Sequence, residues 1–425
     1  MKKRRRLLAL LPLLALLGGC VSPETPVSAS PLPQSSAEPS PVESQTGYRV
    51  TDREDALGTF GVELLKTART EGENTLLSPL SVALALGMVV NGAQGETLRE
   101  LEELFDMPSE ELNAWCAKAL EDYSALGGSS ETNLVNSLWC DDSFTLLDDF
   151  TARCMDSCQA QLFNRDLQDP ATVQALNDWV SEATHGMIPR MLEKFSDRAV
   201  LALVNAVYFK NAFQNPFVAP IEDWEMDFHN ADGTLVHPLG MSNGIREESY
   251  VAVGDGQGVV LPYDDGRLGL LLMLPNEGTA LTEYLEGWNG DTLRQLLDSR
   301  QTARVALKMP KFKAEWSGDL VASLQAMGVE APFNDVLADF STLGHNEAND
   351  PLYIGQIIHK TAFEVNEKGT EASAATLAVL ECGGMPPEQE EFIQLTLERP
   401  FVYAIVDLQN AAPLFIGTVE TLGEL

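Results

Sequence analysis

Basic side chains are scarce in this sequence. It holds 28 lysine and arginine residues against 63 aspartate and glutamate residues, which gives a formal net charge of −35. Such an acidic surface repels a phosphate backbone, so we expect no nucleic-acid partner. The charge is compatible with a positively charged protein or polymer, although acidity of this kind also serves solubility alone.

Cysteine and histidine are also few. Apart from Cys20, five cysteines remain, and an odd number cannot all pair with one another. Their spacing fits no zinc pattern, so we predict no metal site and no cofactor. We interpret most of them as small buried apolar residues, with Cys382 in a loop beside Gly383, Gly384 and Pro386. The five are Cys116, Cys140, Cys154, Cys158 and Cys382.

The signatures of common catalytic sites are missing too. The sequence has no Gly-x-Ser-x-Gly elbow and no His-Glu-x-x-His motif, and the run Gly254–Gly258 lacks the spacing of a dinucleotide-binding turn. Five histidines would allow a dispersed Ser-His-Asp triad, but no feature of the sequence supports one. We therefore predict that the protein is not an enzyme.

The N-terminal apolar run, Leu7–Leu17, is too short to span a membrane. With the basic residues before it, it indicates a secretory signal over residues 1–20. Leu17-Gly18-Gly19-Cys20 resembles the bacterial lipobox, which implies a lipidated Cys20 and a secreted protein anchored at the bacterial surface or envelope. The alternative is ordinary cleavage at a nearby small residue. Residues 21–46, rich in Pro and Ser, indicate a disordered tether.

The rest of the chain, residues 47–425, has the pattern of an α+β protein. Apolar residues make up 44% of the sequence, which is enough for a substantial core. Helices predominate early and strands late, which favours the α+β class. Predicted helices are 95–104, 109–126, 147–158, 171–184, 281–299 and 318–327, and predicted strands include 133–139, 200–209, 352–365, 401–406 and 413–419.

One stretch, FEVNEKGTEASAATLAVL at 363–380, has an unusual composition. It begins with the alternation of a strand, turns at Gly369, and continues as a run of small residues that bury little area. With a two-residue period, one face of the run is Thr370, Ala372, Ala374 and Thr376. This face fits a narrow space between strands. The alternative is a flexible alanine-rich loop or a helical turn.

Seven segments in register give the chain a resemblance to a known family. They are NTLLSPLSVALALGMVVNGAQGET from Asn74, NDWVSEATHGMI from Asn177, NAVYFKNAFQNPF from Asn205, MPKFK from Met309, ADFSTL from Ala338, HKTAFEVNEKGTEASAAT from His359 and RPFVYAIVD from Arg399. Over almost all of residues 48–425 the chain resembles a serpin. The resemblance implies an α+β fold of three β-sheets with eight or nine helices and an exposed reactive loop, at about residues 367–391.

The resemblance also implies a function and a site. The protein is expected to be an irreversible suicide-substrate inhibitor of serine proteases, acting as a monomer that forms a covalent complex with its target. After cleavage, the hinge of the loop inserts into a sheet as a new strand. The implied hinge residues are Glu367, Gly369, Thr370, Glu371, Ala372, Ser373, Ala374, Ala375 and Thr376, and the implied gate residues beneath the sheet are Ser78, Ser81, Asn205 and His359.

Alternatives remain open for both function and site. A serpin that does not inhibit would serve as a surface binding module, although the absence of bulky or charged inward hinge residues favours inhibition. His359 is equally interpreted as a buried histidine with satisfied hydrogen bonds and no switching role. Phe213 stands where the family usually has tryptophan, which is expected to alter the barrier to opening.

The cleaved bond is predicted from the family spacing of about seventeen residues beginning at the hinge glutamate. Counting from Glu367 places it at Gly383-Gly384, with the bonds after Cys382 and Met385 as alternatives because the loop is longer than usual. These small or unbranched side chains favour an elastase-like or subtilisin-like target. No lysine or arginine lies between Gly369 and Glu398, which disfavours a trypsin-like one.

Overall fold

The computed structural model describes residues 56–218, 224–348, 350–370 and 391–423. The chain divides into two units, Met1–Arg49 and Val50–Leu425, and all described residues belong to the second. The predicted signal segment and tether, and most of the reactive loop, lie outside the described residues.

The described residues form nine α-helices and one short 3-10 helix. The helices are α1 (Ala56–Ala68), α2 (Pro79–Val90), α3 (Gly95–Phe105), α4 (Ser109–Ser124), α5 (Asp148–Cys158), α6 (Pro170–Ala183), α7 (Leu281–Glu286), α8 (Thr292–Asp298), α9 (Val321–Ala326) and η1 (Ala331–Phe333). None of these helices combines the length and hydrophobicity needed to cross a bilayer.

Helix α2 is the internal helix of the fold. Ser78 caps it by accepting a hydrogen bond from the Ser81 backbone, and Pro79 provides a preformed first turn. All of its residues except Ala85 are buried, because the helix lies between two sheets and contacts β5 and β18. A helix this apolar on every side has no stable place at the surface.

The sheet that carries the site has six strands. Their order is β12 (Phe312–Asp319), β14 (Ile358–Asn366), β15 (Gly369–Thr370), β5 (Leu201–Ala212), β2 (Glu131–Cys140) and β4 (Gln161–Asn164). All neighbours are antiparallel except β2 and β4.

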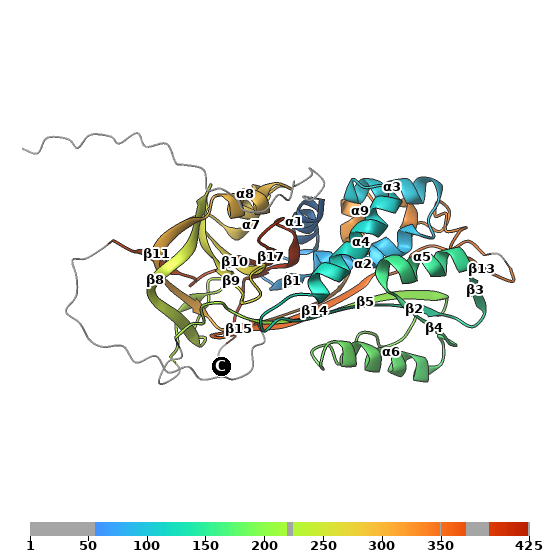
Figure 1. Cartoon of the computed structure of the whole chain (residues 1–425), viewed down its shortest axis with the longest axis horizontal. Helices are drawn as coiled ribbons and strands as arrows, with labels where there is room; N and C mark the ends of the chain where they lie inside the picture. Colours follow the sequence, from blue (N-terminus) through green and yellow to red (C-terminus); the bar gives the residue numbers. More distant parts are fainter. Residues whose placement is uncertain (1–55, 219–223, 349, 371–390, 424–425) are drawn as a thin grey trace, which may run out of the picture. The chain divides into compact units, whose positions relative to one another are not determined.

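Alternation along β2 distributes its residues between two cores. Leu134 and Leu138 face the main core with α2, whereas Trp139 packs with Leu176 and Val180 of α6 in a second core. In Figure 1, α6 accordingly lies on one side of β2 and β5, and α2, α4 and α5 lie on the other.

The second large sheet has eight strands. Their order is β1 (Thr75–Leu77), β18 (Pro413–Val419), β17 (Phe401–Asp407), β10 (Leu268–Pro275), β9 (Gly256–Pro262), β8 (Gly240–Val253), β11 (Gln301–Pro310) and β16 (Ile393–Thr396). Two-stranded sheets pair β13 (Gly344–Asn346) with β3 (Phe144–Leu146) and β6 (Phe228–His229) with β7 (Leu235–Val236).

The α+β class and the helix count are confirmed, but the sheets are grouped differently from the three expected. Strand β8 is long enough to pair with β11 over Gly240–Tyr250 and with β9 over Ser249–Val253. It therefore joins two groups of strands into one hydrogen-bonded sheet.

Three predicted elements were wrong in detail. The strand predicted at 352–365 begins only at Ile358. The helix predicted at 318–327 is preceded by strand β12, whose alternating burial continues to Asp319, and helix begins only at Val321. The single helix predicted at 281–299 is two helices, α7 and α8, separated by a segment that contains Gly287 and Gly290.

Candidate functional site

The hinge of the predicted reactive loop begins inside the six-stranded sheet. Strand β14 ends at Asn366, the chain turns, and β15 returns between β14 and β5. Thr370 pairs with Val365 of β14 and with Asn211 of β5. The first residues of the hinge therefore already occupy a strand position between two neighbours.

Backbone and ionic contacts fix the turn that leads into β15. The carbonyl oxygens of Lys368 and Glu367 accept hydrogen bonds from the backbone N–H groups of Phe213 at 2.7 Å and Phe217 at 2.8 Å. The Glu367 carboxylate lies 2.7 Å from Lys311 Nζ, with both side chains less than one quarter exposed. Glu367 is therefore the fixed end of the hinge.

Gly369 is required at its position by the backbone. Its φ is +152°, and an added Cβ would lie 2.1 Å from the carbonyl oxygen of Asn211. Any other residue would collide with β5, so the turn needs glycine.

Thr370 is completely buried, and its hydroxyl lies 2.5 Å from the hydroxyl of Tyr263. Phe213 stacks on the Tyr263 ring, with centroids 5.3 Å apart and planes 14° apart. The phenylalanine that replaces the family's usual tryptophan thus packs against the tyrosine that holds the hinge.

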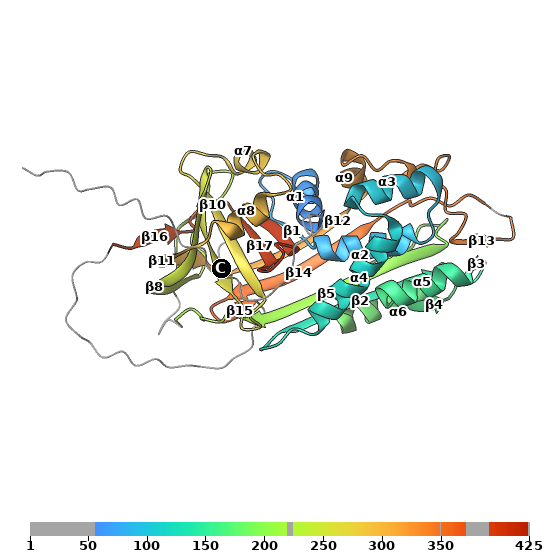
Figure 2. The same ribbon diagram turned by 45° about the horizontal axis from the view of Figure 1, so that its top comes forward.

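Below Thr370, β14 and β5 run alongside each other, as Figure 2 shows, without pairing directly. Among the described residues, the only strand that pairs with the facing edges of both is β15, over two residues. Unpaired edges of this kind accept a further strand.

We call the unpaired boundary between β14 and β5 the seam. The four predicted gate residues lie together at the end of the seam opposite Thr370. The Ser78 backbone N–H donates to His359 Nε2 on β14 at 3.1 Å, and the Ser81 hydroxyl donates to Asn205 Oδ1 on β5. The start of α2 is therefore bonded to both strands that border the seam. Separating the strands requires these bonds to break or rearrange.

The network extends beyond the four predicted residues. Asn205 Nδ2 donates to Asn136 Oδ1 at 2.8 Å, and Asn136 is 1% exposed. Sequence reasoning missed Asn136, although it lies on a recognised strand, because the register that places it opposite Asn205 is visible only in the sheet. Tyr263 and Lys311 were missed because each contacts the hinge from a distant part of the chain.

One segment, residues 184–200, leaves α6 and extends across the sheet. Asn177 of α6 holds it, since its Oδ1 accepts from the backbone N–H groups of Met191 and Leu192 at 2.7 and 2.9 Å. Lys360 of β14 donates to the carbonyl oxygen of Arg190 at 2.9 Å. The segment is thus attached to both α6 and one border of the seam.

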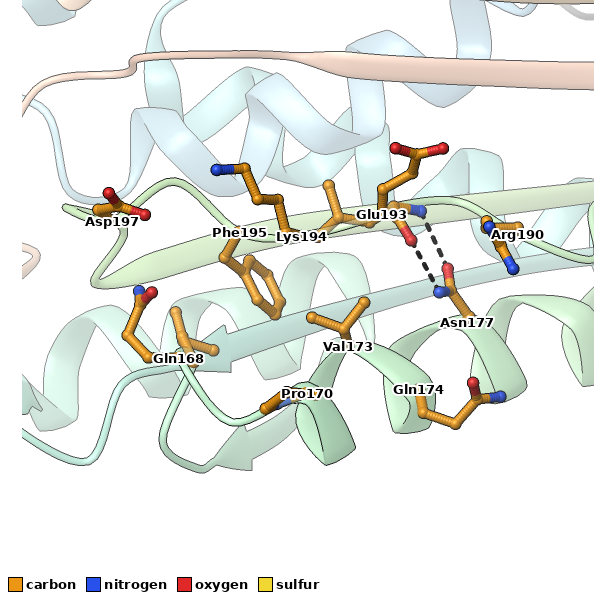
Figure 3. A pocket seen from close by; sticks show the side chains of 12 residues that line it. Gln168, Pro170, Val173, Gln174, Asn177, Arg190, Glu193, Lys194, Phe195 and Asp197 are labelled. Atoms are coloured by element: carbon orange, nitrogen blue, oxygen red, sulfur yellow. Dashed lines mark hydrogen bonds between the residues drawn. The ribbon is translucent and has the colours of Figure 1, made fainter.

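A cavity of about 380 Å³ lies between this segment and α6 (Figure 3). Phe195 and Val173 form part of its wall, and Asn177 bonds to the backbone of Leu192 beside it. Its lining includes no serine, cysteine or histidine. In the described part of the chain, no group of three His, Cys, Asp or Glu side chains is arranged to hold a metal ion.

The remaining predicted site residues lie outside the described residues. These are Cys20, the hinge residues Glu371, Ala372, Ser373, Ala374, Ala375 and Thr376, and the cleavage candidates Cys382, Gly383, Gly384 and Met385.

The gate residue His359 predicts how the stability of the protein depends on pH. Burial lowers the pKa of His359 from 6.5 to about 4, and Nε2 accepts a hydrogen bond, so the ring is neutral in the folded protein. The unfolded chain protonates His359 at a higher pH than the folded protein does. The contribution of neutral His359 to the free energy of unfolding is therefore complete above pH 6.5 and is lost as the pH falls to about 4. The loss amounts to about 3 kcal/mol.

We expect His359→Gln to be less stable than the wild type at pH 7 but to lose less stability on acidification. Urea unfolding midpoints between pH 7 and pH 4 measure both effects. The control is His345→Gln, which removes an exposed histidine and should keep the wild-type slope. Equal slopes for all three proteins would contradict the neutral buried state of His359.

Comparison with known proteins matches this chain to one family. The family model described as "Serpin (serine protease inhibitor)" matches residues 55–422. A serpin-like protein of Thermococcus kodakarensis is 29% identical over 97% of this chain and 98% of its own length, and leukocyte elastase inhibitor of Bos taurus is 30% identical over 85% and 97%.

Solved structures agree with these sequence matches. The thermophilic serpin tengpin in its native state superposes with a TM-score of 0.80 at 31% identity, covering 89% of this chain and 96% of tengpin. In its latent state the TM-score is 0.76 at 28% identity, covering 89% and 100%. With the family model matching most of its length, this chain belongs to the serpin family.

Proposed function

We propose that this serpin is an irreversible, suicide-substrate inhibitor of serine proteases. The observation that carries the proposal is β15: Gly369 and Thr370 already form the start of a strand between β14 and β5. We infer the class of target, a serine protease, from the family description and from relatives such as the leukocyte elastase inhibitor.

The proposed mechanism is the one that the membership of this chain in the serpin family implies. The protease serine attacks a loop carbonyl, releases the downstream part of the loop and remains attached as an acyl-enzyme ester. The cut loop then extends β15 between β14 and β5 and carries the protease with it. A strand of about a dozen residues gains two ladders of hydrogen bonds at roughly 1 kcal/mol each, so about 10 kcal/mol or more favours insertion.

The hinge sequence permits this extension. Thr370 faces the buried side, and Ala372, Ala374 and Thr376 follow it at the two-residue spacing of a strand. None is charged and none is proline, either of which would oppose burial or remove a hydrogen-bond donor. We propose that the protein acts as a monomer, since one chain supplies both the loop and the sheet.

The alternative is a non-inhibitory serpin that acts as a surface binding module without inserting its loop. The early strand position of β15 favours inhibition over this alternative. The two functions predict different unfolding temperatures for the cleaved protein, because only insertion adds hydrogen bonds that the native sheet lacks.

The first functional prediction concerns the covalent complex and its cleaved bond. Elastase-like or subtilisin-like proteases should form a complex that survives boiling in detergent, and trypsin-like proteases should form little. Mass spectrometry of the released peptide should show a start at Gly384 or within two residues of it. Turnover by every protease without a trapped adduct contradicts inhibition, and a start before Leu380 or beyond Pro387 contradicts the assigned bond.

The second prediction tests insertion itself. Thr370→Arg places a charge where the side chain is fully buried, so the variant should be cleaved as a substrate with little complex formed. Loop cleavage should raise the unfolding temperature of the wild type but not of this variant. Glu364→Arg is the matched control, because Glu364 lies exposed on adjacent β14, and it should inhibit normally. An unchanged stoichiometry of inhibition in Thr370→Arg would contradict the insertion mechanism.

We also propose that the protein is secreted and anchored at the bacterial surface or envelope through a lipid on Cys20, followed by the tether of residues 21–46. The lipobox-like sequence Leu17-Gly18-Gly19-Cys20 supports this location. A tethered inhibitor at the surface is positioned to meet proteases that arrive from outside the cell.

The anchor predicts that Cys20→Ser blocks processing or releases the protein from the membrane. Fractionation of cells into membrane and medium, with mass analysis of the mature N-terminus, measures the change. Cys140→Ser serves as a control that removes a buried cysteine elsewhere in the chain. Wild-type protein found wholly in the medium without lipid would refute the anchor.

A further inference from the structure

Three free cysteines lie together beneath α2. Cys116 of α4 and Cys154 and Cys158 of α5 are each 0% exposed. The Cys154 thiol lies 3.6 Å from the Met88 carbonyl oxygen, and the Cys158 thiol lies 3.9 Å from that of Leu84. Helices α4 and α5 contact each other here and both contact α2.

The Cys116 and Cys158 side chains both contact α2 at Gly87, where the missing side chain leaves room for them. A Cβ atom added to Gly87 of α2 would lie 2.6 Å from Cys116 Sγ and 3.9 Å from Cys158 Sγ. The two sulfurs therefore face the same position on α2 from two different helices. Cys154, one turn away on the same helix as Cys158, does not share this position.

The two thiols are chemically unequal. The hydrogen bond that Cys116 donates lowers the pKa of Cys158, while the same interaction and burial raise the pKa of Cys116. Burial also raises the pKa of Cys154. In the folded protein the Cys116 thiol therefore donates to the Cys158 sulfur.

Cys158 is also bonded to the gate network. Its carbonyl oxygen accepts a hydrogen bond from Asn136 Nδ2 at 2.6 Å, and Asn136 Oδ1 accepts from Asn205. Asn205 in turn accepts from Ser81 at the start of α2. Three successive hydrogen bonds therefore connect α5 to β5, which borders the seam, and to α2.

We propose that Cys116 and Cys158 are a disulfide-forming pair that ties α4 to α5 and holds the gate closed more firmly when oxidised. The oxidant is a disulfide, either small or carried by a protein, encountered while the chain folds and before α2 covers the thiols. Export, as proposed above, supplies an oxidising compartment.

The exchange proceeds in two balanced steps. The thiolate of either cysteine attacks one sulfur of the oxidant disulfide and displaces the other as a thiolate, leaving a mixed disulfide. The thiolate of the second cysteine then attacks the protein sulfur of this mixed disulfide and displaces the second oxidant thiolate. Two protein thiols are oxidised, one disulfide is reduced to two thiols, and the two protons released by the cysteines pass to those thiols.

The first test refolds the full chain from urea in a mixture of reduced and oxidised glutathione. Free thiols are then alkylated, and peptides are identified by mass spectrometry. We expect a Cys116–Cys158 linked peptide, with Cys140 and Cys154 alkylated. Cys116→Ser should abolish the link, and the matched variant Cys154→Ser should keep it. No linked peptide, or a link through Cys140, Cys154 or Cys382 in its place, overturns the pairing.

The second test measures the gate without a protease, so its outcome is independent of the proposed inhibition. Amide hydrogen exchange of α2 and β5 is compared between reduced and oxidised protein. We expect exchange near Ser81 and Asn205 to slow by about threefold or more on oxidation of the wild type, and to stay unchanged in Cys116→Ser. Equal rates in reduced and oxidised wild type overturn the coupling to the gate.

Discussion

The structure depends on a sheet that is complete at one end of a seam and unpaired along the rest. Strand β15 joins β14 to β5 over two residues, and the two larger strands do not pair directly with each other. Backbone groups at strand edges favour a partner strand, and the small residues after Thr370 belong to the same chain. The fold therefore contains both an acceptor and, in sequence, the strand suited to fill it.

The polar contacts at the two ends of the seam have different tasks. At the upper end, Tyr263 and Lys311 fix the first hinge residues. At the lower end, Ser78 and Ser81 bond α2 to β14 and β5. Buried polar groups need partners, so opening the seam must exchange these bonds for others.

The hinge has local signals in the sequence, whereas the gate has none. Gly369 and the alternation of small residues carry local signals, because a turn and a strand face are encoded by neighbours. Ser78 and His359 are 281 positions apart, so only resemblance to a family connected them. Strand β12 was missed although Phe312 and Ala314 alternate with exposed residues, because Gly318 was interpreted as a helix start instead of the end of a strand. Tyr263 and Asn136 were inaccessible to sequence reasoning, since their roles arise from packing across elements.

The hydrogen bond between Lys360 and the Arg190 carbonyl oxygen affects the order in which the loop would enter the sheet. Lys360 lies five positions before Val365, the partner of Thr370, so a strand growing from β15 reaches this bond after several residues have already been seated. Early seating proceeds while residues 184–200 remain attached to β14, and later seating requires them to lift. Loop entry is therefore expected to advance in two stages, a short reversible one and a longer committed one. In the proposed mechanism, the time between the two stages is the interval in which a bound protease either escapes or is captured.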